Sequence, residues 1–154
     1  MTLFKKIKSD DDIKGFIKSI FDMDLSLDGS WGYSQELATI IKQKTDTTIT
    51  QLEHSIALMR TYIEMNIALE KDNRYTGITL NEILREEYNY NNLIYHKVTY
   101  NITAIKEIKY NAFIKEYKAN YGNKDFNMSN HFDKRKKASL NRTETYWFEV
   151  SKII

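Results

Sequence analysis

Residues 93–104 form the longest stretch in which apolar and polar side chains alternate. A period of two, with many β-branched and aromatic residues, predicts a half-buried strand near the centre of a sheet. The polar cluster 89–92 predicts a turn before this strand. A strand over about 80–88 would complete a hairpin, although residues 76–90 also fit a helical turn. The face expected to be buried carries Ile94, His96, Val98, Tyr100, Ile102 and Ala104.

Two stretches with an apolar residue every three or four positions predict the first two helices. The first covers about 10–21, with Ser9 as its N-cap and three aspartates at the positive end of its dipole. The second begins near Thr50, where Glu53 has the spacing of a capping box. One face of this second helix stays apolar to about Leu69.

A third helix is predicted over about 110–121, where Gly122 has the position of a C-terminal cap. Residues 130–137 fit either a helical turn or an extended basic segment. Alternating or β-branched patterns predict further strands over 22–28, 37–42 and 140–150.

The predicted order of elements is α-β-β-α-β-β-α-β. Short turns between strands favour an antiparallel or mixed sheet of about four to five strands, with three amphipathic helices packed mainly on one face. A length of 154 residues suits a single globular domain over 1–154. We therefore expect an α+β fold with one core.

Aromatic side chains are the main feature that the predicted core does not explain. The chain has 11 tyrosines and 2 tryptophans, and glycines on both sides of Trp31 predict a sharp turn over 29–33. Tyr and Trp are enriched at protein interfaces, although a tyrosine-rich sheet can also bury its rings and leave its hydroxyls in water. We predict a protein-interaction module that binds itself as a homodimer or neutralises a protein partner. Its predicted partner-binding residues are Trp31, Tyr33, Tyr88, Tyr90, Tyr95 and Trp147.

A basic segment supports an alternative function, nucleic-acid binding. Clustered cations beside aromatic rings suit phosphate contact and base stacking. The net charge of the chain is only +2, so such binding would depend on this local patch. Lysines before an edge strand can also serve to prevent edge-to-edge pairing. The candidate residues are Lys134, Arg135, Lys136, Lys137 and Arg142, with Phe132 and Trp147 nearby.

The tripeptide Glu107-Ile108-Lys109 resembles the E-x-K element of the PD-(D/E)xK nucleases. In that family acids hold a divalent metal and the lysine steadies the nucleophile. The resemblance therefore implies a metal-dependent nuclease, in which Glu86 or Glu87 would supply a further acid. The chain departs from the family pattern because Glu107 is expected at the start of a helix, where the helix dipole favours an acid.

Two other hypotheses involve His96. A pair of His96 with Glu53, across a contact between helix and strand, could carry out acid–base chemistry. A lone histidine on an apolar strand face is, however, more often a core residue. A small-ligand pocket between sheet and helices, lined by Tyr100, Tyr117 and His96, is the third functional option.

The remaining composition excludes several classes of chemistry. The chain has no cysteine, which excludes thiol catalysis, thiolate-bound zinc and disulfides. Five glycines form no phosphate-binding loop, and the three histidines show no two-histidine metal spacing. We expect no cofactor and no metal, and favour a role without catalysis. No segment has the pattern of a signal peptide or a membrane span, so we expect a cytoplasmic protein.

Overall fold

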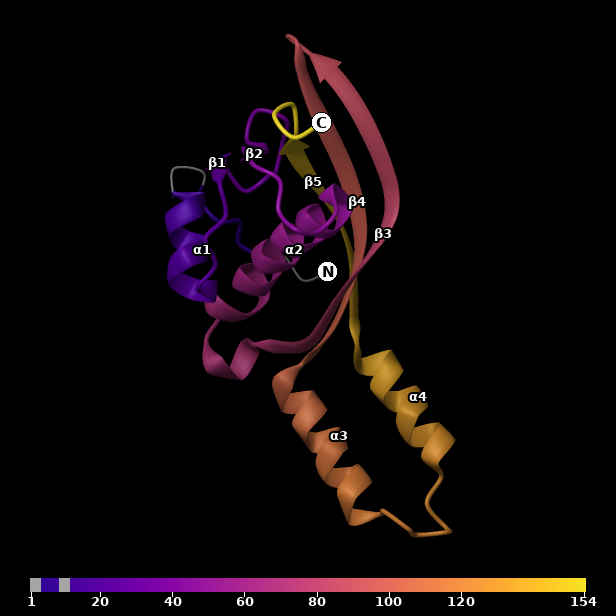
Figure 1. Ribbon diagram of the computed structural model, residues 1–154. Helices are drawn as coiled ribbons and strands as arrows, with labels where there is room; N and C mark the ends of the chain where they lie inside the picture. The colour runs from indigo at the N-terminus through magenta and orange to yellow at the C-terminus, as the bar shows by residue number, and fades with distance from the viewer. Residues whose placement is uncertain (1–3, 9–11) are drawn as a thin grey trace.

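The computed structural model describes residues 4–8 and 12–154. Within these ranges five strands form one mixed sheet in the order β1-β2-β5-β4-β3, with β2 and β5 parallel and the other neighbours antiparallel. This arrangement confirms the predicted α+β class and sheet size. The strands are β1 Leu27–Gly29, β2 Thr39–Ile41, β3 Tyr75–Tyr90, β4 Leu93–Lys106 and β5 Leu140–Glu149 (Figure 1).

The described residues contain four α-helices, one more than predicted. α1 and α2 lie together on one side of the sheet, whereas α3 and α4 project beyond its end (Figure 1). Among the described residues, no helix combines the length and the apolar character needed to cross a membrane. The helices are α1 Ile13–Phe21, α2 Ile49–Tyr62, α3 Glu107–Ala119 and α4 Met128–Ala138, with a π-helical turn Ile63–Ile67 after α2 and a 3-10 turn Lys71–Asn73 before β3.

β3 and β4 form a long hairpin with a two-residue turn. Tyr90 pairs with Leu93, and the intervening Asn91 and Asn92 have φ angles of 50° and 63°. Positive φ at both central residues is the geometry of a type I′ turn, which asparagine tolerates well. The predicted turn and the predicted strand that follows it are confirmed, and residues 76–90 are a strand.

A bulge in β3 determines which of its side chains face the helices. The register shifts between Glu82 and Leu84, so Ile83 is an extra residue in this strand. Beyond the bulge, Arg85 pairs with the buried Val98. Glu82 and Arg85 therefore both point to the inner face, the side covered by α1 and α2, although a spacing of three would separate them in a regular strand.

The beginnings of the two inner helices differ from the prediction. Ser9 lies outside the described residues, and Asp12 stands at the cap position before α1. The capping box of α2 is formed by Thr48 and Gln51, each of whose side chains accepts a hydrogen bond from the backbone N–H of the other. Because the cap lies two residues earlier than predicted, Glu53 is not part of it and is fully buried.

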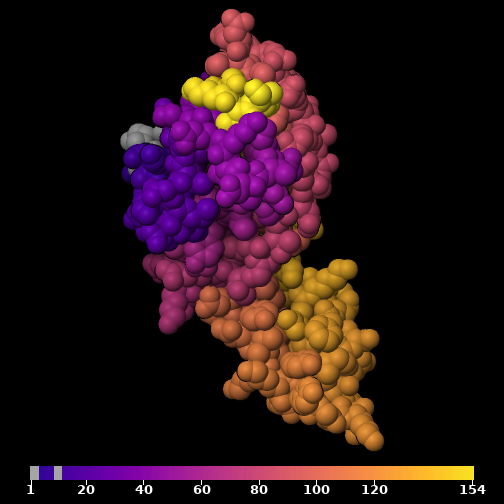
Figure 2. Space-filling model, in the orientation of Figure 1, coloured from indigo at the N-terminus to yellow at the C-terminus, as the bar shows by residue number. Residues whose placement is uncertain are grey.

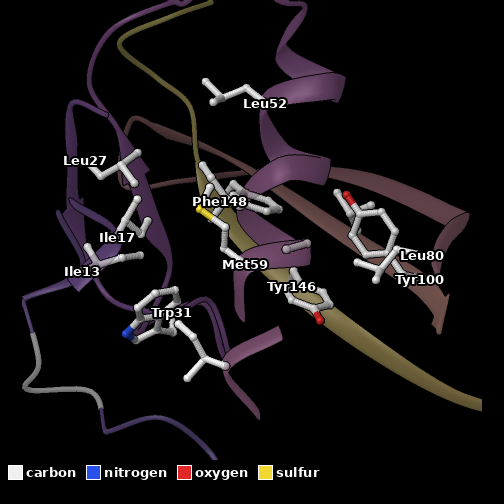
Figure 3. Close-up of a cluster of buried hydrophobic side chains, with 14 of the residues drawn as sticks. Ile13, Ile17, Leu27, Trp31, Leu52, Met59, Leu80, Tyr100, Tyr146 and Phe148 are labelled. Atoms are coloured by element: carbon white, nitrogen blue, oxygen red, sulfur yellow. The ribbon is translucent and has the colours of Figure 1, made fainter. Parts of the chain in front are cut away.

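The core lies between the inner helices and the inner face of the sheet (Figure 3). Burying an aliphatic side chain contributes about 1.5–3 kcal/mol and an aromatic one at least as much, so the large side chains dominate its stability. The largest apolar side chains with less than 2% exposure are Trp31, Tyr100, Tyr146, Phe148, Ile13, Ile17, Ile41, Met65 and Ile102.

The predicted turn around Trp31 is confirmed. Gly29 and Gly32 have φ angles of 77° and 79°, and a Cβ on Gly32 would lie 2.8 Å from the carbonyl oxygen of Trp147. Only glycine fits such a close approach of two backbones. The strands on either side, β1 and β2, have three residues each and are shorter than predicted.

Residues 107–138 form a helical hairpin, here named the arm, that extends away from the rest of the molecule (Figure 2). α3 has no buried residue. The interior of the arm is mainly aromatic: the ring of His131, which is 1% exposed, lies 5.1–5.9 Å from four other rings. These rings are Phe113, Tyr117, Phe126 and Phe132. Residues 130–137, whose sequence fits either a helical turn or an extended basic segment, are thus helical.

Candidate functional site

Three aromatic side chains gather on the outer face of the sheet, the side opposite α1 and α2. The ring centroid of Trp147 lies 5.6 Å from that of Tyr88 and 6.5 Å from that of Tyr95. The ammonium of Lys97 lies 5.4 Å from the Trp147 ring, close enough for a cation–π contact. We call Tyr88, Tyr95 and Trp147 the outer aromatic cluster.

Strand register explains this gathering. Tyr88 of β3 pairs with Tyr95 of β4, and Lys97 of β4 pairs with Trp147 of β5. Side chains opposite each other, or diagonal by two residues, are within reach of aromatic rings. The bulge is necessary for this alignment, because it brings the even-numbered residues of β3 onto the outer face.

Further apolar side chains of β3 extend the exposed surface around the cluster. Ile83 is 58% exposed, Leu84 is 53% exposed and Tyr90, beside the hairpin turn, is 58% exposed. Tyr90 and Tyr95 also line a cavity of about 310 Å³ with Gln35 and Glu36. Four of the six aromatic residues predicted to bind a partner therefore lie on or near this face.

The other two residues predicted to bind a partner, Trp31 and Tyr33, do not lie with the outer aromatic cluster. Trp31 is 1% exposed and belongs to the core, so it does not fit the predicted role on a binding surface. Tyr33 is half-buried, and its hydroxyl donates a hydrogen bond to Glu64 at 2.5 Å. Burial, followed by the negative charge of Glu64, raises the pKa of Tyr33 well above its ordinary value.

Trp31 and Tyr33 both contact the buried arginine Arg60. The Arg60 guanidinium lies between two rings, 3.4 Å from the centroid of Tyr146 and 4.1 Å from that of Tyr33. It donates hydrogen bonds to the carbonyl oxygens of Trp31 at 3.0 Å and Thr145 at 3.2 Å. Glu64, 3.8 Å from Arg60 Nε, provides the opposite charge. This network joins α2, β5 and the Trp31 turn.

Arg142 belongs to the same network and not to the exposed basic patch. Its Nη2 donates to Glu64 at 2.7 Å, and its guanidinium lies 4.4 Å from the ring centroid of Phe4. Its side chain is only 11% exposed. The structure does not bring Arg142 together with Lys134–Lys137, with which it was predicted to bind nucleic acid, since those cations lie on α4.

A second charged cluster lies on the inner face. Glu53, which is fully buried, accepts a hydrogen bond from Arg85 Nη1 at 2.7 Å, and its other oxygen lies 2.7 Å from His96 Nδ1. Arg85 also pairs with Glu82, and His96 Nε2 lies 3.3 Å from Glu87. The predicted contact between Glu53 and His96 is thus present. The hydrogen bond that the charged imidazolium donates to Glu53 raises the pKa of His96, because it favours the charged form.

The residues of the nuclease-like hypothesis do not come together. Glu107 begins α3, next to the end of β4 that pairs with Tyr75, whereas Glu86 pairs with Lys97 near the opposite end of the hairpin. Lys97 and Lys106 are nine positions apart along β4, a distance of roughly 30 Å. Within the described part of the chain, no group of three or more acids and histidines is arranged to hold a metal ion.

The predicted small-ligand pocket is not formed by the residues proposed for it. Tyr117 lies in the arm, whereas Tyr100 lies in the core against Tyr146. An open cavity of about 350 Å³ does lie between α2 and the start of β3. It is lined by Phe21, Leu58, Met59, Tyr62, Asn66, Tyr75, Thr76, Gly77 and Ile78.

The burial of Glu53, Arg60 and Glu64 can be inferred from their spacing in the sequence, although this spacing is easily misinterpreted. Steps of three or four residues lead from Glu53 through Ile56 and Arg60 to the pair Ile63 and Glu64, so the helical repeat places all five on the face that turns to the core. Charged residues on a helix are usually assigned to solvent. Three charges on an otherwise apolar face predict a buried ionic network.

Comparison with known proteins adds no identification, since no family model, no curated protein and no solved structure matches the chain.

Proposed function

We propose that this protein is an interaction module that associates with a second copy of itself through the outer aromatic cluster. The observation that carries the proposal is the gathering of Tyr88, Tyr95 and Trp147 on a face of the sheet that α1 and α2 leave uncovered. Tyr and Trp are the residues most often found as hot spots at protein interfaces. We further propose that the association takes place in the cytoplasm, where a chain without cysteine needs no oxidising conditions.

The outer aromatic cluster would form the centre of the interface, and its exposed neighbours would enlarge the contact area. A fully buried aromatic side chain contributes about 150–250 Å². Because Tyr88 is 40% exposed and Tyr95 and Trp147 are part-buried in the monomer, the cluster alone supplies less than half of the roughly 450–750 Å² that three such side chains would bury on each partner. A standard interface buries about 800 Å² per partner. Leu84 and Tyr90, both more than half exposed, extend the surface toward this value.

The charges on this face favour a second copy over an unrelated partner. Glu86 and Lys97 lie directly opposite each other on β3 and β4, beside the outer aromatic cluster. A two-fold interface requires a surface that is complementary to itself. A patch with one acid and one base around an apolar centre meets this requirement, because rotation by 180° can place each charge opposite its counterpart.

We expect the wild-type protein to be dimeric at micromolar concentration and the Trp147→Ala variant to dissociate about 30-fold more readily. The reason is the loss of a hot-spot side chain, which costs about 2 kcal/mol of binding free energy. Sedimentation velocity over a range of concentrations measures this change. Tyr121→Ala is the matched control, because Tyr121 is an exposed aromatic residue of the arm and its loss should leave the dimer intact.

A charge-exchange series tests the two-fold geometry. Lys97→Glu and Glu86→Lys should each weaken the dimer, and the double variant should restore it. Thermal unfolding of each variant at low concentration shows whether the monomer remains folded. A wild-type protein that stays monomeric at all concentrations, or a dimer unaffected by Trp147→Ala, would refute the proposal.

A further inference from the structure

The arm carries a charge opposite to that of the rest of the chain. Residues 107–138 contain eight lysines and arginines against four acids, so their net charge is +4, whereas the chain as a whole has +2. The remaining residues are therefore net acidic by two charges. Such a separation of charge gives the arm a positive field that the total charge conceals.

The arm also presents aromatic rings beside its cations. Tyr121 is 78% exposed and Phe132 is 47% exposed. Both rings pack against Tyr117, with centroids 6.1 Å and 6.2 Å away, so the three form a continuous row. The guanidinium of Arg135 lies 5.2 Å from the centroid of Phe132 at the end of this row.

Lysines flank this row along the chain. Lys118 and Lys124 lie on either side of Tyr121 in sequence, and Lys134 and Lys136 follow Phe132 on α4; all four are exposed. An ion pair with Asp133 at 3.0 Å partly neutralises Lys137. The other cations of α4 thus remain available to an external anion.

We propose that the arm binds single-stranded nucleic acid. Cations that follow a phosphate backbone, combined with exposed rings on which bases stack, are the features by which proteins bind single strands. Phosphate contacts alone would not distinguish a duplex from a single strand. The exposed rings do, because only unpaired bases can present their faces to Tyr121 and Phe132.

Fluorescence anisotropy with a labelled 15-nucleotide DNA of mixed, non-self-complementary sequence tests this proposal on the full chain. We expect binding at low salt. The logarithm of the affinity should fall linearly with the logarithm of the salt concentration, because lysines and arginines that contact phosphates release counterions from the nucleic acid. Tyr121→Ala should weaken binding about tenfold without changing this slope, because it removes a ring and no charge. Phe132→Leu is the second ring variant and keeps an apolar side chain in the arm.

Charge reversal tests the phosphate contacts separately. The triple variant Lys134→Glu, Lys136→Glu, Lys137→Glu should abolish binding at physiological salt. The control is Lys42→Glu, Lys44→Glu, Lys71→Glu, which makes the same change in net charge at exposed positions outside the arm and should bind nearly as well as the wild type. Circular dichroism of all variants shows that the helices are retained.

Three outcomes would overturn the proposal. One is the absence of binding by the wild type at low salt. Another is equal affinity for a duplex of the same sequence with no effect of Tyr121→Ala, which would indicate phosphate contact alone. The third is binding to vesicles with anionic lipid while the oligonucleotide is ignored, which would make the arm a membrane-binding element. Because the sites are separate, loss of nucleic-acid binding leaves the Trp147 dimer to be tested on its own.

Discussion

Replacement of Arg60 by alanine should lower the free energy of unfolding by about 3–5 kcal/mol, the range observed when one partner of a buried ion pair is removed. The side chain is 1% exposed and packs between the rings of Tyr33 and Tyr146. Its loss removes the donor to two carbonyl oxygens, the buried one of Trp31 and the part-buried one of Thr145. It also leaves a cavity between the rings.

Urea denaturation measures this effect as a change in the midpoint at constant slope. Arg60→Met keeps much of the volume but no donor, and should cost about 1–3 kcal/mol for the unsatisfied carbonyl groups. Lys18→Ala is the control, since the exposed pair of Lys18 with Asp22 contributes well under 1 kcal/mol. A loss below about 1 kcal/mol for Arg60→Ala would show that the network does not stabilise the fold.

The sequence predicts those elements whose two faces differ strongly in polarity. β4 and β5 are recognisable because their alternation continues for ten residues or more, and a shift of one residue would expose the buried side chains. α2 is recognisable because its apolar residues recur at helical spacing. In these elements the local pattern and the final packing agree.

The details that position the candidate sites depend on contacts between distant residues. The bulge at Ile83 has no local signal, yet it places Arg85 against Glu53. Trp31 looks like a binding residue because glycines surround it, but α1 and the sheet cover it: the ring of Phe16 lies 5.9 Å from it. In both cases a long-range contact overrides what the local sequence suggests.

One helix of the arm, α4, is harder to predict than the other, for a different reason. The faces of α4 differ little in polarity, because this helix buries only His131. A helix that packs with only one neighbour needs only a narrow apolar stripe. Residues 130–137 therefore show no clear periodicity, and aromatic contacts with α3 hold this helix in place.

Replacement of Glu53 by alanine should cost at least about 3 kcal/mol of stability. Glu53 is fully buried and pairs with the cation Arg85 and with His96, which is a cation only when protonated. The side chains of these partners are 26% and 12% exposed, so they can turn partly to water, which keeps the expected loss near the lower end of the range for broken buried pairs. Glu53→Gln is the matched variant: it keeps the volume and removes the charge, and should cost less.

Stability should also depend on pH through His96. The hydrogen bond to Glu53 raises the pKa of His96 in the folded state, so the folded protein holds this proton more tightly than the unfolded chain does. The stabilisation is therefore complete below the unfolded pKa of about 6.5 and is lost as the pH rises through the higher folded value. Urea midpoints between pH 5.5 and 9 should fall with pH in the wild type and change less in His96→Gln. His54→Gln is the control, because the His54 ring bonds the uncharged Leu80 carbonyl and no carboxylate of the described residues. An unchanged slope in His96→Gln would assign the pH dependence to another group.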